Sequence, residues 1–320
     1  MICLNKYLKE YFKYSFFWRQ LGQMRKNKKA EVKECQDDFK EKLVVITGAT
    51  SGIGYCTARK YASHGANLLL INRNEEKSIK VCEEIRQDYG VECEYKIADF
   101  TRISDLKKVG YELLDSDINV DVFIHNAGVY STKKIFTEDN IELVFQVDYL
   151  GSFILNYILK DKLKAQGNTR IIFVNSEGHR FALLGLSLDD LEYEEHHYSG
   201  LRSYGKAKIA QLLSMISFNE YFKDSGVLIN AMHPGSVKTN MGENNGRTYR
   251  FFKHHLIDRA AKSPEISAKA LYYLGVSKEM NGVSSKFYRL TAEEKPAPPA
   301  LDRQVAEELW DLSIKLGGLA

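Results

Sequence analysis

The stretch Leu43–Gly54, with the sequence LVVITGATSGIG, constrains the fold of this chain more than any other. Its first five residues are mostly aliphatic and β-branched, which is typical of a buried parallel strand. The strand runs into a glycine-rich turn, and the residues after the turn have the pattern of a helix. A strand that turns tightly into a helix presents free N–H groups and the positive end of the helix dipole, which favour phosphate binding.

Each glycine of this turn is expected to serve a different structural purpose. Gly48 permits the turn, Gly52 lets a phosphate approach the backbone, and Gly54 lets the helix pack closely on the strand. The spacing is G-x-x-x-G-x-G rather than the commoner G-x-G-x-x-G, so a turn that binds nothing is the alternative. We predict a dinucleotide phosphate site formed by Gly48, Thr50, Ser51, Gly52, Ile53 and Gly54.

Composition excludes several classes of protein. Of 320 residues, 44% are hydrophobic and 27% charged, as in a soluble globular protein with a sizeable core. The net charge is +3, but residues 1–33 carry nine Lys or Arg and two Glu, which leaves −4 for the rest and argues against nucleic-acid binding. Five scattered cysteines without C-x-x-C spacing indicate a reducing, cytoplasmic compartment and argue against a disulfide framework or a zinc site.

Residues 1–40 form a separate basic and aromatic extension, ahead of a single domain over residues 41–320. Apolar side chains recur at helical spacing, with lysines largely opposite them: Leu4, Tyr7, Leu8, Tyr11, Phe12 and Trp18 against Lys6, Lys9 and Lys13. This pattern suits a helix in a membrane interface, and equally one packed on its own domain or on a second subunit in a homodimer. No run is apolar enough to span a bilayer. Residues 25–42 are interpreted as a solvated linker.

Strand and helix patterns alternate from residue 42 onward. This order predicts right-handed βαβ units and a parallel sheet with helices on both faces, so that ligand lies beyond the carboxyl ends of the strands. The expected strands are Asn67–Ile71, Glu92–Ile97, Val120–Ile124, Arg170–Val174 and Val227–Met232. The expected helices are Glu75–Tyr89, Ile103–Leu114, Thr137–Lys164 and Tyr204–Phe222, with another from Pro264.

The end of the second strand indicates which cofactor is bound. An acidic residue about 20 positions beyond the glycines would bind the ribose 2′-OH of NAD. This chain instead has Asn72-Arg73-Asn74, with Lys77 one helical turn later. An arginine there would pair with the 2′-phosphate of NADP, so NADPH is favoured over NAD, the alternative being a solvent-facing arginine.

The next two strand ends carry further candidates for cofactor contacts. Asp99 suits the adenine amino group, although a helix cap is an almost equal alternative. Asn126, Ala127 and Gly128 put small residues where the backbone would pass the cofactor.

Tyr204 and Lys208 are four residues apart on an expected helix, so their side chains share a face. A nearby ammonium lowers the pKa of a phenol, which could then exchange a proton with an alcohol or carbonyl oxygen. Ser176, just past the fifth strand, could polarise that oxygen. A chance surface pair and a turn-forming serine are the alternatives.

Together these motifs resemble the short-chain dehydrogenase/reductase family. The matching elements are TGATSGIG at 47–54, NAG at 126–128, Ser176, YGKAK at 204–208 and HPGSVKT at 233–239, in the family's order and spacing over about residues 42–290. Arg73, the His233-Pro234-Gly235 segment and the Leu309-Trp310 helix resemble the retinol-dehydrogenase-like branch in particular.

The resemblance implies a doubly wound Rossmann sheet of about seven strands in three α/β/α layers. It implies hydride transfer between nicotinamide and a carbonyl carbon, with Tyr204 as acid/base, Ser176 as orienting group and Lys208 as ribose anchor. Further cofactor contacts are expected from Pro234, Gly235, Val237 and Thr239, and a substrate lid over about residues 236–264, where Phe251, Phe252 and Leu256 could line an apolar pocket.

Two positions depart from the family pattern. Asp148 stands where most members have Asn in the catalytic group, and an ionised Asp cannot donate a hydrogen bond. Slower turnover is the hypothesis that follows. His125 stands where Asn is usual, and it is interpreted as a histidine packed at a strand end rather than a catalytic group.

The resulting prediction is an NADP(H)-dependent oxidoreductase acting on an apolar retinoid-, steroid- or xenobiotic-like carbonyl or alcohol. A dinucleotide-binding regulator or scaffold with little turnover is the alternative, supported by Asp148 alone. No metal site is expected, because His196-His197 and its acidic neighbours match no ligand spacing.

Overall fold

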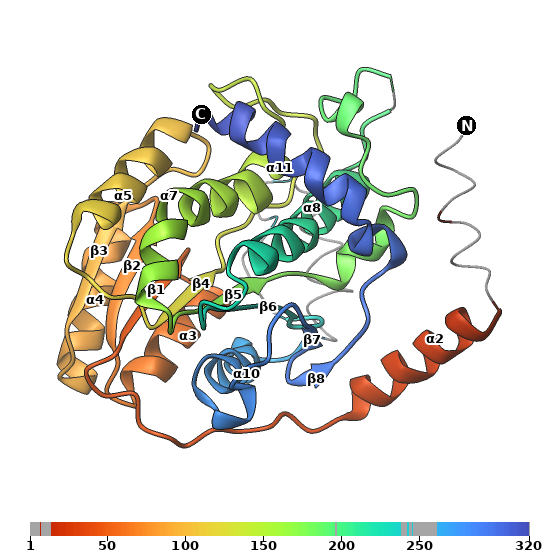
Figure 1. Cartoon of the computed structure of the whole chain (residues 1–320). Helices are drawn as coiled ribbons and strands as arrows, with labels where there is room; N and C mark the ends of the chain where they lie inside the picture. The colour runs from red at the N-terminus through yellow and green to blue at the C-terminus, as the bar shows by residue number, and fades with distance from the viewer. Residues whose placement is uncertain are drawn as a thin grey trace.

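The computed structural model describes residue 7 and residues 14–195, 197–237, 242, 245 and 261–319, with the backbone alone for 14–21. Its centre is an eight-stranded sheet of order β3-β2-β1-β4-β5-β6-β7-β8, in which the first seven strands are parallel (Figure 1). The strands are β1 Leu43–Thr47, β2 Asn67–Asn72, β3 Cys93–Ile97, β4 Val122–His125, β5 Arg170–Val174, β6 Leu228–His233, β7 Phe287–Arg289 and β8 Ala292–Glu293.

Helices cover both faces of the sheet. Neighbouring residues of each strand point to opposite faces, and both sets are apolar, so each face needs a cover of helices. Val45 faces one core, which packs under α5 Ile103–Asp115, α7 Gly151–Gln166, α8 Gly200–Tyr221 and α11 Arg303–Gly317. Val44 faces the other core, under α3 Gly52–Ala62, α4 Glu75–Tyr89 and α10 Pro264–Val276. The three-layer doubly wound fold is therefore confirmed.

The C-terminal helix α11 closes the first core with an aromatic cluster. The Trp310 ring lies 4.7 Å from the Phe218 ring and 5.2 Å from the Phe153 ring, centroid to centroid, and Leu309 is fully buried. The helix expected at Leu309-Trp310 thus packs on α7 and α8.

Most expected elements lie within two residues of their observed bounds, but two differ. Residues 137–142 are not helical: Phe136 and Glu142 form a β-bridge, and the helix begins with α6 Leu143–Phe145. It then passes through a single π-helical turn, η1 Gln146–Leu150, before α7. Helix α8 begins at Gly200 rather than Tyr204, which places Tyr204 in its second turn.

Residues 25–42 are mostly exposed to solvent, as predicted, but the interpretation of this segment as a free linker was wrong. Helix α2 Tyr14–Lys29 runs into this segment, which then lies along the domain. Asn27 and Cys35 are buried, and the Phe39 ring packs edge-on against Tyr61 at 5.9 Å. Isolated buried positions at irregular spacing have no periodic pattern, so the charged residues around them dominated the sequence signal.

Within the extension, the Tyr7 side chain is buried and its hydroxyl donates to Asp302 Oδ2 at 2.6 Å. Leu4, Leu8, Tyr11 and Phe12 lie outside the described residues. Among the helices that the structure describes, none combines the length and apolar character needed to cross a membrane.

Candidate active site

The glycine-rich turn between β1 and α3 is shaped by contacts that only glycine allows. Gly48 and Gly52 have φ of 68° and 57°, in the left-handed region that side chains disfavour. A Cβ on Gly54 would lie 2.3 Å from the Gly48 carbonyl oxygen and 2.5 Å from Asn126 Nδ2. The turn is therefore folded as the sequence predicted, with helix and strand in direct contact.

The first turn of α3 is suited to hold a phosphate. Ser51 is its N-cap residue in extended conformation, and its side chain makes no capping hydrogen bond in the structure. The N–H groups at the start of the helix are left for a ligand, which the helix dipole would favour if it is anionic. Thr50 is half-buried, Ser51 exposed and Ile53 buried beside them.

The end of β4 is tied to this turn by Thr47 and Asn126. The Thr47 hydroxyl accepts from the backbone N–H groups of Asn126 and Ala127, both at 2.9 Å. The Asn126 amide donates to the carbonyl oxygens of Thr47 and Gly48 at 3.0 and 2.9 Å. These hydrogen bonds hold the carboxyl ends of β1 and β4 together beside the glycine-rich turn.

The end of β2 presents Arg73 to solvent. Its side chain is exposed and no described residue forms an ion pair with it, so the guanidinium can accept an anionic group. Asp99 makes a local turn instead of facing solvent freely. Its Oδ1 accepts from the Thr101 N–H and hydroxyl at 2.9 and 2.8 Å, just before α5, which resembles the helix cap given as its alternative role. The adenine contact of Asp99 stays a prediction.

Tyr204 and Lys208 share the inner face of α8, as their spacing predicted. Lys208 Nζ lies 5.5 Å from the centre of the Tyr204 ring, and the Tyr130 ring meets Tyr204 edge-on at 5.8 Å. Tyr204 is half-buried and Lys208 buried. Ser176 faces the same place: its hydroxyl and the Tyr204 ring lie 3.2 and 2.7 Å from where a Gly178 Cβ would stand.

The prediction of a lowered phenol pKa was wrong. Burial raises the pKa of Tyr204 and outweighs the Lys208 ammonium, which lowers it as expected. The Asp148 carboxylate raises it further, and a hydrogen bond with Ser176 acts in the opposite direction. The net effect is a phenol that keeps its proton at neutral pH.

Asp148 is brought to Lys208 by the π-helical turn η1. Its Oδ2 lies 3.1 Å from Lys208 Nζ, and its Oδ1 accepts from the Val129 N–H at 2.6 Å. Both charged side chains are buried. Burial opposes the charge on Lys208, but the Asp148 carboxylate prevails and raises the pKa of the amine.

Asn175 is a residue that sequence reasoning missed. Its Oδ1 accepts from the Ser176 N–H at 2.8 Å, and its Nδ2 donates to the Lys208 carbonyl and to Gln211 Oε1 at 3.0 and 2.9 Å. It therefore fixes the position of Ser176 relative to α8. A polar residue at the end of an apolar strand, directly before Ser176, was the available signal.

His125 is a packed histidine, as interpreted. Its Nε2 is 2.8 Å from Asn156 Oδ1, its ring stacks on Phe123 at 4.2 Å, and burial lowers its pKa to about 4. As the last residue of β4, it packs against Phe123, Phe173 and Asn156, and no described contact joins it to Tyr204.

The loop after β6 completes the described part of the site. Pro234, Gly235 and Val237 are half-buried, Gly235 has φ of 74°, and Val237 forms a β-bridge with Lys262. Thr239 and most of the expected lid, including Phe251, Phe252 and Leu256, lie outside the described residues.

One described residue of the expected lid, Asn245, makes contacts. It accepts from the Thr132 N–H at 2.7 Å and donates to the Tyr130 carbonyl at 2.8 Å. These bonds fix the loop that carries Tyr130, whose ring meets Tyr204.

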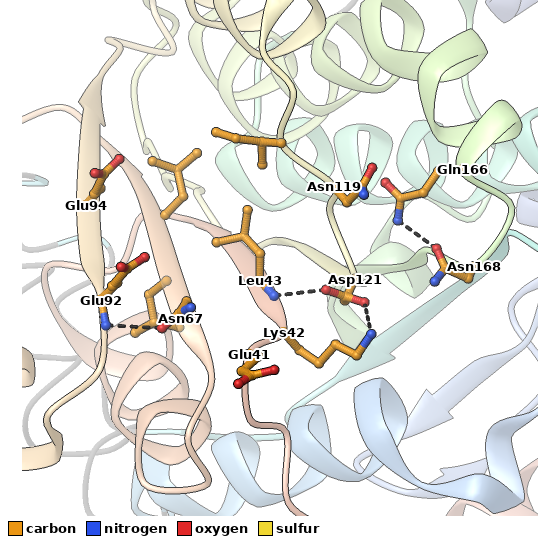
Figure 2. Close-up of a pocket in the computed structure, with 13 residues that line it drawn as sticks. Glu41, Lys42, Leu43, Asn67, Glu92, Glu94, Asn119, Asp121, Gln166 and Asn168 are labelled. Atoms are coloured by element: carbon orange, nitrogen blue, oxygen red, sulfur yellow. Dashed lines mark hydrogen bonds and ion pairs between the residues drawn. The ribbon is translucent and has the colours of Figure 1, made fainter.

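A cavity of about 680 Å³ lies elsewhere (Figure 2). It opens at the beginnings of β1 and β2, around Lys42 and Asn67, where the Lys42 ammonium pairs with Asp121 at 3.1 Å. Ligands of doubly wound folds bind at the opposite, carboxyl ends of the strands. The residues predicted from the sequence therefore mark the candidate site, and this cavity does not.

Comparison with known proteins agrees with this geometry. The family model for short chain dehydrogenase matches residues 42–187. Human retinol dehydrogenase 13 is 33% identical over 284 residues, covering 87% of this chain and 85% of the relative. Human retinol dehydrogenase 14 is 29% identical over 303 residues, covering 87% of both. The WW domain-containing oxidoreductase of Danio rerio is 30% identical, covering 87% of this chain and 69% of the relative.

Solved structures share the fold. An uncharacterized protein from Mycobacterium Paratuberculosis has a TM-score of 0.68 at 23% identity, covering 88% of this chain and 95% of its own. A short chain dehydrogenase from Shigella flexneri complexed with NADP has a TM-score of 0.63 at 19% identity, covering 80% and 99%. The chain therefore belongs to the short-chain dehydrogenase/reductase family of oxidoreductases, in its retinol-dehydrogenase-like branch.

Proposed function

We propose that the protein is an NADP(H)-dependent oxidoreductase that interconverts a carbonyl and an alcohol on an apolar small molecule of retinoid-, steroid- or xenobiotic-like character. The observation that carries this proposal is the grouping of Tyr204, Lys208 and Ser176 at the carboxyl end of β5. The retinol dehydrogenases among its relatives support the substrate class.

The residues around the glycine turn fit a phosphorylated dinucleotide. Gly48 and Gly52 adopt left-handed backbone angles, Gly54 packs against the Gly48 carbonyl, and the start of α3 offers N–H groups to a pyrophosphate. Arg73 has its guanidinium exposed where the 2′-phosphate of NADP would lie. Pro234, Gly235, Val237 and Thr239 are proposed to contact the nicotinamide end.

A bound nicotinamide cofactor supplies the hydride for carbonyl reduction or accepts it in alcohol oxidation. In reduction, Tyr204 gives its phenolic proton to the substrate oxygen, while the Ser176 hydroxyl donates a hydrogen bond to the same oxygen. The Lys208 ammonium stabilises the phenolate that remains and would hold the ribose. Burial raises the pKa of Tyr204, so the phenol carries the proton that reduction requires.

Exposed apolar side chains in the segment between Ser176 and Tyr204 support an apolar substrate. Phe181, Leu183, Leu184 and Leu201 belong to the segment between Ser176 and Tyr204, and about half of each side chain is exposed. Apolar side chains left exposed along the segment that joins two proposed catalytic residues favour an apolar ligand.

Purified protein with NADPH and a panel of apolar aldehydes and ketones tests the proposal. Oxidation of NADPH that depends on the carbonyl compound, with NADH a poorer donor, is the expected result. Binding of neither nucleotide, measured by fluorescence or calorimetry, would contradict it.

Asp148→Asn should change the pH dependence of the reaction. The neutral amide leaves the Lys208 charge uncompensated beside Tyr204, so the pKa of the phenol falls. Alcohol oxidation requires the phenolate, and we expect its pH–rate curve to move by about one unit to lower pH, with a rise of about tenfold at pH 7.

Asp161→Asn, on the exposed side of α7, is the matched control and should leave the curve in place. An Asp148→Asn protein with the wild-type curve would remove the basis for slower turnover. If the wild-type and Asp148→Asn proteins both bind NADPH but convert no carbonyl compound, the chain is the dinucleotide-binding regulator considered as the alternative.

We further infer a cytoplasmic protein that contacts a membrane peripherally through residues 1–40. Basic residues crowd the last turn of α2, at Lys26, Lys28 and Lys29, which favours an anionic lipid surface. In flotation with anionic vesicles, the full chain should float with the vesicles, and a variant with Lys26, Lys28 and Lys29 changed to Gln should stay behind. If both float equally, or if the full chain instead forms a dimer without binding vesicles, the extension has another role.

A further inference from the structure

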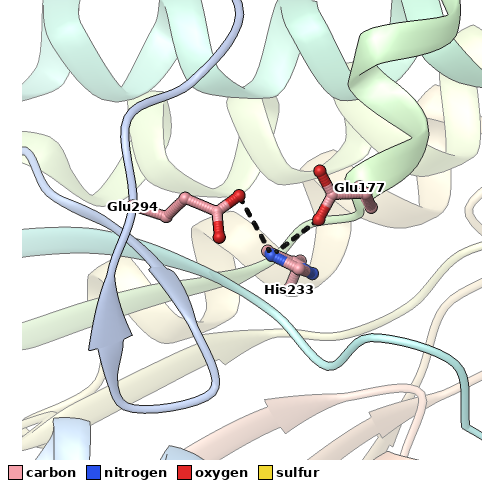
Figure 3. A group of neighbouring side chains, drawn as sticks. All are labelled: Glu177, His233 and Glu294. Carbon is pink, nitrogen blue, oxygen red and sulfur yellow. Dashed lines mark ion pairs between the residues drawn. The ribbon is translucent and has the colours of Figure 1, made fainter. Parts of the chain in front are cut away.

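A group of charged side chains joins segments that are distant in the sequence, and Figure 3 shows three of them, the partly exposed Glu177 and the buried His233 and Glu294. His233 Nε2, at the end of β6, lies 3.0 Å from Glu177 Oε2 and 3.8 Å from Glu294 Oε1. Arg180, from the 3₁₀ turn Glu177–Phe181, donates to Glu177 Oε1 at 2.5 Å and to Glu294 Oε1 at 2.9 Å. We call these four residues the His233 cluster.

The His233 cluster is electrically balanced only when the histidine carries a proton. His233 and Glu294 are almost fully buried, with side-chain exposures of 1% and 2%, so their charges require partners. Two carboxylates then face one guanidinium and one imidazolium. Burial opposes protonation, but Glu177 and Glu294 outweigh it and raise the pKa of His233.

Other polar groups packed around the cluster do not supply a replacement charge. His179 is close, but burial lowers its pKa to about 3 and its Nε2 accepts from the Ala297 N–H at 3.0 Å, so it is neutral. Asn27 of α2 donates its amide to Glu294 Oε2 at 3.3 Å. Arg289 of β7 donates to the Asn27 carbonyl at 2.8 Å and not to a carboxylate of the cluster. Lys295, next to Glu294, is exposed to solvent.

A divalent cation is the obvious occupant of two carboxylates and an imidazole whose ligand atoms lie within 4.8 Å of one another. Arg180 argues against it, because its guanidinium already donates to both carboxylates and supplies the positive charge. The arrangement is that of a closed ionic network rather than an open metal site.

The position of the cluster links it to two parts of the proposed site. Glu177 directly follows Ser176, whose hydroxyl accepts from the Gly178 N–H at 3.0 Å in the same turn. His233 directly precedes Pro234 and Gly235, which begin the loop proposed to contact the cofactor. One imidazole ring therefore spans the ends of β5 and β6.

We propose that protonated His233 is a positioning residue, which holds the Ser176 turn and the Pro234-Gly235 loop together through Glu177 and Glu294. This inference rests on the proposed function. When His233 loses its proton, two carboxylates share one guanidinium, and their repulsion acts on both segments at once. Affinity for NADPH should therefore fall as the pH rises through the pKa of His233.

The sign follows from linkage. A pKa raised in the folded protein contributes stability at low pH, and this stability is lost as the pH rises from the ordinary histidine range to the raised value. His125 and His179 titrate far below this range. Folding stability and NADPH affinity should therefore be lost at the same midpoint pH, which lies above the ordinary pKa of histidine.

Glu294→Gln tests the proposal, since it preserves shape but removes one of the two carboxylates. We expect both midpoints, thermal unfolding and NADPH affinity by fluorescence titration, to move to lower pH by about one unit. The matched control is Glu293→Gln, the neighbouring exposed residue paired with Lys286 at 3.0 Å, which should keep the wild-type midpoints. If Glu294→Gln does not fold, Glu177→Gln replaces it with the same expectation.

Each outcome decides the matter. A shift of both midpoints in Glu294→Gln alone supports the positioning role. Unchanged midpoints, or a shift in stability while NADPH affinity keeps the wild-type profile, overturn it, since the cluster would then be structural only. If no protein binds NADPH at any pH, the proposed function has failed, and this is recognised separately because the unfolding profile does not depend on the cofactor.

Discussion

Tyr204→Phe is expected to lower the rate of carbonyl reduction by about 10²- to 10⁴-fold, the usual contribution of a positioned acid or base. The ring remains, so its edge-on contact with Tyr130 and the packing of α8 are kept. Only the proton that the substrate oxygen would receive is lost. Steady-state NADPH oxidation measures the loss, and nucleotide titration should give a dissociation constant within about twofold of wild type.

Tyr221→Phe, at the far end of the same helix, is the matched control for this substitution. Its hydroxyl bonds to the exposed Asp161, away from the site, and its removal should leave turnover intact. A Tyr204→Phe enzyme that kept wild-type turnover would end the acid–base assignment. Equal loss of nucleotide binding would instead place the tyrosine in the binding step.

Arg73→Ala is expected to weaken NADPH binding by about 10- to 100-fold, because a hydrogen bond to a charged group contributes about 1.5–3 kcal/mol. The same change should leave NADH binding within about twofold, since NADH lacks the 2′-phosphate. Calorimetric titration of both nucleotides gives the two affinities directly. Arg73 makes no ion pair with any described residue, so its removal should not disturb folding.

Lys80→Ala on the exposed side of α4 controls for the general loss of positive charge near this strand end. If Lys80→Ala weakens NADPH binding as much as Arg73→Ala does, the effect is long-range attraction. If both nucleotides lose affinity equally in Arg73→Ala, the arginine does not read the 2′-phosphate and the NADP assignment is wrong.

The sheet and most helices were predictable because each is a local, periodic pattern. The run Leu43–Thr47 and the helix Glu75–Tyr89 carry their signal within themselves, including the Asn74 cap and the left-handed Gly90 that ends the helix. The Tyr204 and Lys208 pair was predictable for the same reason, since helical spacing alone puts the two side chains on one face.

What escaped prediction depends on residues far apart in the chain. The contact of Asp148 with Lys208 spans 60 positions and needs a π-helical turn, which has no clear sequence signature. The raised pKa of Tyr204 follows from its burial, which only the packed structure reveals. The His233 cluster draws its members from separate segments, and none of them is unusual by itself.

The edges of the sheet limit how two copies could associate. On one side the short antiparallel strand β8 covers β7, and the amides of Gln23 and Asn27 donate to the Glu293 carbonyl of β8 at 3.2 and 3.0 Å. On the other side β3 exposes Glu94, and its Lys96 pairs with Glu112 at 2.6 Å. Occupied carbonyls and charged side chains both discourage strand addition between molecules. Association of two copies through the edge strands is therefore disfavoured, which leaves the helical faces as the surfaces for self-association.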